Sequence, residues 1–190
     1  LSKQETYWRQ WQSRTLPVIE KDFPGAENIV KDAAGVSFEL GVGETRRLLT
    51  RVNHAFGTEI NDILLTALGL AVNKTWGHNK VSISLEGHGR ESLFDEVDIS
   101  RTVGWFTSMY PVLLDFSLGS DLGRQVKETK ETLRKIPDKG VGYGILRYLT
   151  PAGGEKDMVF NMNPQVSFNY LGQTDGEIHR SDFQVAGEPV

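Results

Sequence analysis

The run from residue 58 to residue 77 constrains the fold of this chain more than any other stretch. It reads TEINDILLTALGLAVNKTWG and is apolar on nearly every side of a helix, which is typical of a buried helix rather than a surface one. Such a helix needs other elements packed around it, so the chain must build a hydrophobic core. We expect its amino-terminal cap at Thr58 or Asn61.

Three further stretches show helical periodicity. Residues 1–15, 44–57 and 120–136 each place apolar or aromatic side chains on one side of a helix. The last of them should turn four side chains inward: Leu122, Val126, Leu133 and Ile136. Residues 143–150 predict a short helix, whereas residues 16–35, interrupted by prolines and glycines, predict an irregular connector.

The remaining apolar stretches predict strands. Residues 80–87 (KVSISLEG) alternate with a period of two, so every second side chain faces the same way. Residues 102–116 form a second extended run, and Pro111 within it favours an edge strand or a bulge. Residues 35–41 and 164–172 are expected to be short strands. Because strands and helices alternate, the predicted class is α/β, with a mixed sheet covered by helices.

Composition narrows the possible functions. The 190 residues suffice for one domain or for one lobe of a larger unit. With 38% hydrophobic and 24% charged residues the chain has a soluble globular composition, and its net charge of -4 gives no general attraction to nucleic acid or anionic membranes. It has no cysteine, which excludes disulfides and thiolate metal sites. We expect a cytoplasmic protein without nucleic-acid or membrane partners.

The most informative polar motif is EGHGRE at residues 86–91. Glu86 lies on the polar face of its strand, at the carboxyl end, where open α/β sheets bind ligands. The two glycines of the motif allow a tight turn and the close approach of a substrate. A simpler interpretation is a turn in which Glu86 pairs with Arg90 or Arg101 while His88 is solvated. The residues alone leave both interpretations open and favour the simpler one.

Other candidate residues are weaker. His88 has a suitable ordinary pKa for acid–base work, but His54, His78 and His179 are isolated, so we expect no metal site. The glycines of PDKGVGYG (137–144) follow the end of a helix, which disfavours a nucleotide loop and favours a turn that inserts Tyr143 into a cavity. No G-x-S-x-G pattern supports a catalytic serine.

Five stretches, in this order, resemble the C-terminal half of an epimerization domain of nonribosomal peptide synthetases, within the condensation-domain superfamily. They are NDILLTALG (61–69), EGHGRE (86–91), RTVGWFTSMYP (101–111), PDKGVGYG (137–144) and FNYLGQ (168–173). The second and third are the most specific, because related condensation domains differ there. The resemblance implies a fold like chloramphenicol acetyltransferase, in which two α/β lobes form a V around a tunnel.

The family's reaction inverts the α-carbon of an aminoacyl or peptidyl thioester. The thioester is carried on the 4′-phosphopantetheine arm of a carrier protein, so we expect no cofactor bound directly to this chain. Inversion needs a base on one face, an acid on the other and donors for the enolate oxygen. The resemblance maps one acid–base residue onto Glu86. It assigns Asn169 and Tyr170 to substrate positioning or enolate stabilisation.

The resemblance also implies roles for neighbouring residues and for the rest of the domain. His88 and Arg90 should organise the glutamate loop, and Trp105 and Tyr143 should line the tunnel or pack beside it. The family's second acid–base residue is a histidine of H-H-x-x-x-D-G on the N-terminal lobe, a motif that does not occur here. We therefore expect residues 1–35 to be a helix and connector at the lobe junction and residues 36–190 to be the C-terminal lobe.

Such a lobe should depend on partners. We expect it to be inactive or nearly so in isolation, to need the N-terminal lobe of its domain and a peptidyl carrier protein, and to self-associate through an exposed apolar strip. Two alternatives stay open. A condensation-type acyltransferase lobe would form peptide bonds without using Glu86, and a noncatalytic module would only dock a carrier protein.

Overall fold

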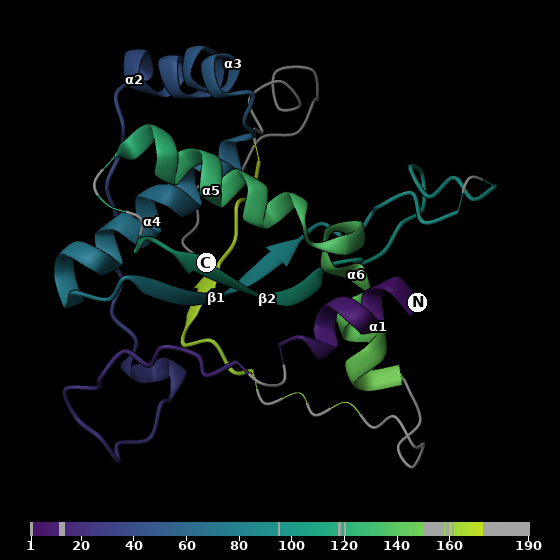
Figure 1. Ribbon diagram of the computed structural model, residues 1–190, viewed down its shortest axis with the longest axis horizontal. Helices are drawn as coiled ribbons and strands as arrows, with labels where there is room; N and C mark the ends of the chain where they lie inside the picture. Colours follow the sequence, from purple (N-terminus) through teal and green to yellow (C-terminus); the bar gives the residue numbers. More distant parts are fainter. Residues whose placement is uncertain are drawn as a thin grey trace.

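A mixed three-stranded sheet organises the computed structural model, which describes residues 2–11, 14–94, 96–117, 119, 121–149, 158, 160 and 162–172. Strand β1 (Lys80–Gly87) is central, β2 (Ser108–Asp115) pairs with it antiparallel, and β3 (Val166–Phe168) pairs with it parallel. Helices α4 (Ile60–Trp76) and α5 (Leu122–Arg134) lie together over one face of this sheet (Figure 1). The predicted α/β class, a mixed sheet covered by helices, is confirmed.

The other helical segments are short. Helix α1 (Ser2–Arg9) lies beside α6 (Val141–Gly144), which contacts β2 (Figure 1). Helices α2 (Val42–Arg47) and α3 (Asn53–Phe56) are joined by a π-helical turn over Leu48–Val52. The remaining segments are the 3-10 turns Val30–Asp32 and Pro137–Gly140 and the π-helical turn Ile145–Leu149.

No single helix in the described part of the chain is long and apolar enough to cross a membrane. The segments Val42–Phe56 and Ile60–Trp76 reach the required length and composition only when taken together, and they are bent by 99° at the break between them.

The amino-terminal cap of helix α4 lies between the two predicted positions. Its amino-terminal cap is Glu59, whose backbone N–H donates to Oδ2 of Asp62 at 2.8 Å. Thr58 is used differently: its hydroxyl donates to Oδ1 of Asn53 at 3.1 Å and ties down the end of α3. Gly57, with a φ of +57°, ends α3 in the left-handed conformation that glycine favours. The predicted caps at Thr58 and Asn61 are therefore wrong.

The core lies between the sheet and the helices and continues into an aromatic cluster. The alternation of β1 is confirmed, because Val81, Ile83 and Leu85 are all buried on the core side. At the other end of the core, Trp8 of α1 is 0% exposed. Its ring lies 4.8 Å from the ring of Tyr143 and 6.4 Å from that of Tyr110. These aromatic contacts attach the first helix to α6 and β2.

Two expectations about the elements are wrong. Residues 35–41 are extended but form no strand, and Val36 and Phe38 are 96% and 86% exposed. A strand needs a hydrogen-bonded neighbour, and this segment has none among the described residues. The expected first helix is also too long, since α1 ends at Arg9 and residues 14–15 are not helical. Residues 12–13, Thr150, Gln173 and His179 lie outside the described residues.

Helix α5 and strand β2 are close to expectation. Of the predicted inward residues, Val126 in α5 is buried and Leu133 is half-buried, and Ile136 is buried just beyond the end of the helix. Leu122 is 58% exposed because it stands at the first position of the helix, beside the cap Asp121. Strand β2 lies at the edge of the sheet, as Pro111 predicts.

Tyr110 makes the stability of this fold depend on pH. Burial raises the pKa of its phenol to about 12, and the charge of Glu91 adds to the shift. An unfolded chain loses this proton near its ordinary pKa of about 10, so the folded state holds more protons between pH 10 and pH 12. The stability that is present below pH 10 should therefore fall as the pH rises toward 12.

A Tyr110→Phe variant has no phenol proton to lose at this position. Its free energy of unfolding should therefore lack the decrease that Tyr110 causes in the wild type, which amounts to roughly 2 kcal/mol at about pH 11.5. Urea unfolding of both proteins at about pH 9 and about pH 11.5 measures the difference. Equal losses in the two proteins would show that the Tyr110 proton is not held by the fold.

Candidate active site

Glu86 stands at the carboxyl end of β1, pointing away from the face that carries Leu85 and the core. Because Leu85 pairs with Phe168 in the parallel ladder, the residues that follow, Glu86 and Asn169, leave neighbouring strands at the same end of the sheet. Together with Tyr170 they line an open depression of about 610 Å³. The structure thus brings together the predicted acid–base residue and the two predicted positioning residues.

The carboxylate of Glu86 is half-buried, and no partner for it lies in the part of the chain that the structure describes. Among the described residues it forms no ion pair and accepts no hydrogen bond. The simpler interpretation of the motif, a pair between Glu86 and Arg90 or Arg101, is therefore not what the structure shows. A free carboxylate in a depression is available to a ligand.

Arg90 shapes the wall of the depression instead. Its guanidinium donates to the backbone carbonyls of Ile99, Thr102 and Gly104 at 3.1, 2.9 and 3.2 Å. It also lies 4.3 Å from the ring centroid of Phe106, in cation–π geometry. Hydrogen bonds from a charged donor are the stronger kind, so Arg90 holds the loop after Ile99 against the end of β1.

His88 is turned toward its own loop. Nδ1 accepts a hydrogen bond from the backbone N–H of Arg90 at 3.0 Å, and Nε2 lies 3.1 Å from Oε1 of Glu91. The other oxygen of Glu91 is 3.4 Å from Nζ of Lys139. These contacts fit the predicted organising roles of His88 and Arg90, which stay predictions as far as function is concerned.

The loop also requires glycine at position 89. Gly89 has a φ of +66°, and a Cβ there would collide with the carbonyl oxygen of Phe106. The small residue lets two backbone segments touch at the rim of the depression.

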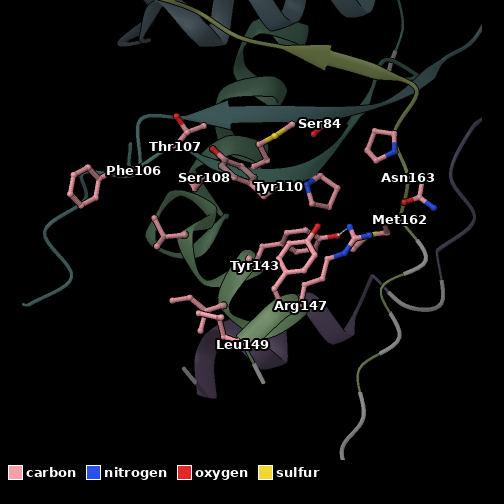
Figure 2. A pocket seen from close by; sticks show the side chains of 17 residues that line it. Ser84, Phe106, Thr107, Ser108, Tyr110, Tyr143, Arg147, Leu149, Met162 and Asn163 are labelled. Atoms are coloured by element: carbon pink, nitrogen blue, oxygen red, sulfur yellow. Dashed lines mark hydrogen bonds between the residues drawn. The ribbon is translucent and has the colours of Figure 1, made fainter. Parts of the chain in front are cut away.

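Trp105 and Tyr143, each predicted to line the tunnel or to pack beside it, line different hollows. Trp105 lines the Glu86 depression but is 89% exposed, so it does not pack against the protein. Tyr143 is buried and lines a second cavity, drawn in Figure 2, which shares Phe106 and Thr107 with the Glu86 depression. The predicted insertion of Tyr143 beside a cavity agrees with this placement.

Sequence reasoning missed two kinds of residue in this region. Asn61 lines the depression with Glu86, and its Oδ1 is buried without a hydrogen-bond partner in the described part of the chain. Its only signal in the sequence was its place in the NDILLTALG motif. Phe106 and Thr107 also line the depression. Within the described residues, no group of three histidine, aspartate or glutamate side chains is placed to hold a metal ion.

A family model described as "Condensation domain" matches residues 1–189. The chain belongs to the condensation-domain family. It is 49% identical over 174 residues to surfactin synthase subunit 1 of Bacillus subtilis (strain 168), a match that covers 91% of this chain and 5% of that protein.

The chain is similar to two solved structures at very different sequence identities. The epimerization domain from the third module of tyrocidine synthetase B is 47% identical, with a TM-score of 0.84 over 92% of this chain and 40% of that chain. The first condensation domain of the CDA synthetase is 19% identical, with a TM-score of 0.52 over 80% of this chain and 32% of that chain. The second match shows the shared condensation-domain fold alone. The chain spans less than half of either crystallised domain.

Proposed function

We propose that this chain is the catalytic-glutamate half of an epimerization domain in a nonribosomal peptide synthetase. Its substrate is an aminoacyl or peptidyl thioester on the phosphopantetheine arm of a carrier protein, and its reaction inverts the α-carbon from L to D. The observation that carries the proposal is the half-buried carboxylate of Glu86, which is unpaired among the described residues and lies in a depression shared with Asn169 and Tyr170.

The comparison of identities favours epimerisation over condensation. The chain is 47% identical to an epimerization domain and 19% identical to a condensation domain of the same fold. Forming a peptide bond requires no proton transfer at an α-carbon, so a condensation site has no use for a glutamate at this place. Inversion requires a proton transfer at the α-carbon, and a carboxylate at this place can take part in it.

The chemistry of inversion gives each of these residues a role. One group removes the α-proton as the C–H electron pair becomes the enolate, and a second group delivers a proton to the opposite face of the carbon. Glu86 is one of these groups, acting as a base or as an acid according to the direction of the reaction. Asn169 and Tyr170 supply hydrogen-bond donors that position the thioester or stabilise the enolate oxygen.

The second acid–base group comes from outside these 190 residues. Residues 36–190 form the C-terminal lobe in this proposal, residues 1–35 join it to the N-terminal lobe, and the histidine that faces Glu86 belongs to that other lobe. The exposed apolar side chains of the chain, among them Val36, Phe38 and Val103, are where a partner lobe or a second copy would pack. The lobe alone is inactive in this proposal.

Isotope exchange tests the function in the intact two-lobed domain. A carrier protein loaded with an L-aminoacyl thioester is incubated with the domain in deuterated water. We expect deuterium at the α-carbon together with a mixture of L and D products. Dipeptide formation without α-deuterium would instead identify a condensation-type acyltransferase, and carrier binding with neither reaction would identify a docking module.

A further inference from the structure

A second cavity, of about 720 Å³, lies beside the Glu86 depression. Figure 2 shows it between the sheet residues Ser84, Ser108 and Tyr110 on one side and Tyr143, Arg147 and Leu149 on the other. Its volume is within the range of small-molecule sites. Most of the side chains around it are apolar or aromatic, so a charged side chain among them requires an explanation.

Arg147 carries the single formal charge among the described residues that line this cavity. It is half-buried and forms no ion pair with the described part of the chain. Nη1 donates to the hydroxyl of Tyr143 at 3.1 Å, and the guanidinium lies 5.9 Å and 5.2 Å from the ring centroids of Tyr143 and Tyr148. The planar group is therefore oriented by aromatic rings, while most of its five N–H donors have no acceptor among the residues that the structure describes.

The hydroxyl groups around Arg147 add further donors. Tyr143 accepts from Arg147, so its own proton is free to be donated, and burial raises the pKa of this phenol so that the proton stays in place at neutral pH. Oγ of Ser108 is buried and has no hydrogen-bond partner among the described residues. The carboxylates that would neutralise Arg147 are absent from the described lining. An unpaired cation with hydroxyl donors in an apolar cavity is suited to an anion.

The cavity adjoins the Glu86 depression. Phe106 and Thr107 line both of them, so a ligand can reach from Arg147 past these two residues toward Glu86. A group bound at Arg147 can thus belong to the same molecule whose reacting carbon lies at Glu86.

We propose that this cavity binds an oxyanion of the substrate, a phosphate ester or a carboxylate, with Arg147 as its counter-ion and the hydroxyls of Tyr143 and Ser108 as donors. The identity of the ligand rests on the proposed function. A phosphopantetheine arm carries a phosphate at one end, and a peptidyl substrate can carry an acidic side chain. Both present the oxygen geometry that a guanidinium recognises with paired hydrogen bonds.

Calorimetric binding to the intact domain tests the site with two pairs of probes. The first pair is 4′-phosphopantetheine and pantetheine, which differ by the phosphate. The second is the pantetheine thioesters of glutamate and glutamine, which differ by one carboxylate at nearly constant shape. We expect the wild-type domain to prefer the anionic member of one pair by about tenfold or more, and the pair that shows the preference identifies the anion.

The preference should fall to about unity in Arg147→Met and be partly retained in Arg147→Lys, which keeps the charge. Arg124→Met, on the exposed surface of α5, is the matched control and should keep the full preference. If Arg147→Met does not fold, Arg147→Gln takes its place. A wild-type domain without an anion preference, or a preference unchanged in the Arg147 variants, would overturn the proposal.

Binding and turnover separate the two proposals. An anion preference that depends on Arg147, in a domain that exchanges no α-deuterium, would support the anion site and reject epimerisation. Exchange of α-deuterium without any anion preference would support epimerisation and reject the anion site.

Discussion

Replacing Glu86 by glutamine in the intact domain should lower the rate of α-deuterium exchange by about 10²–10⁴-fold. Glutamine keeps the size of the side chain and much of its polarity but can neither take nor deliver the α-proton. Because the Glu86 carboxylate has no partner in the described part of the chain, the substitution removes no structural contact. Carrier affinity and thermal stability should stay close to those of the wild type.

The matched control is Glu128→Gln on the exposed surface of α5, which should leave exchange unchanged. Mass spectrometry of the released amino acid after single-turnover reactions gives the exchange rate directly. Unchanged exchange in the Glu86 variant would end the catalytic assignment. A change in carrier affinity alone would favour the docking-module alternative.

Replacing Trp8 by alanine should destabilise the 190-residue chain by about 3–5 kcal/mol. The side chain is 0% exposed, and its indole lies within 6.4 Å, ring centroid to ring centroid, of Tyr7, Trp11, Tyr110 and Tyr143. Its removal leaves a cavity where α1, α6 and β2 meet, and those elements cannot all close around it. Thermal unfolding should shift downward by roughly 6–20 °C.

Trp76→Ala serves as the control, because Trp76 is 53% exposed at the end of α4 and the same truncation there creates no enclosed cavity. Its cost should stay within about 0.5 kcal/mol. If the two variants unfolded at the same temperature, the aromatic cluster around Trp8 would contribute nothing to the stability of this chain.

Periodicity was a sound guide wherever an element is defined by its own residues. Helix α4, helix α5 and strand β1 lie where the sequence predicts them, because the spacing of apolar side chains selects which face is buried. Residues 35–41 show the limit of this reasoning. Their alternation fits a strand, but strand formation depends on a neighbour, and the described sheet consists of β2, β1 and β3.

The residues of the candidate site could be predicted from the sequence, but their arrangement in space could not. The resemblance pointed to Glu86, Asn169 and Tyr170, which line one depression. It could not tell that Trp105 lines the same depression while Tyr143 lines a second cavity. Arg90 was expected to organise the loop, yet its three carbonyl acceptors, at residues 99, 102 and 104, could not be read from its neighbours in sequence. Nothing in the sequence singled out Arg147, because whether an arginine has a partner among the described residues depends on which segments surround it in the fold.

The sequence by itself determined the α/β class, the strand that carries Glu86 near its carboxyl end and the buried helix before it, because the spacing of apolar residues a few positions apart indicates each element and the face it buries. Only the tertiary structure decided that Glu86 and Asn169 line one depression, that the Glu86 carboxylate has no partner among the described residues, and that the described lining of the second cavity holds no counter-charge for Arg147. These features depend on how segments that are far apart in the chain lie next to one another. They exist only once β1, β2, β3 and α6 have packed together.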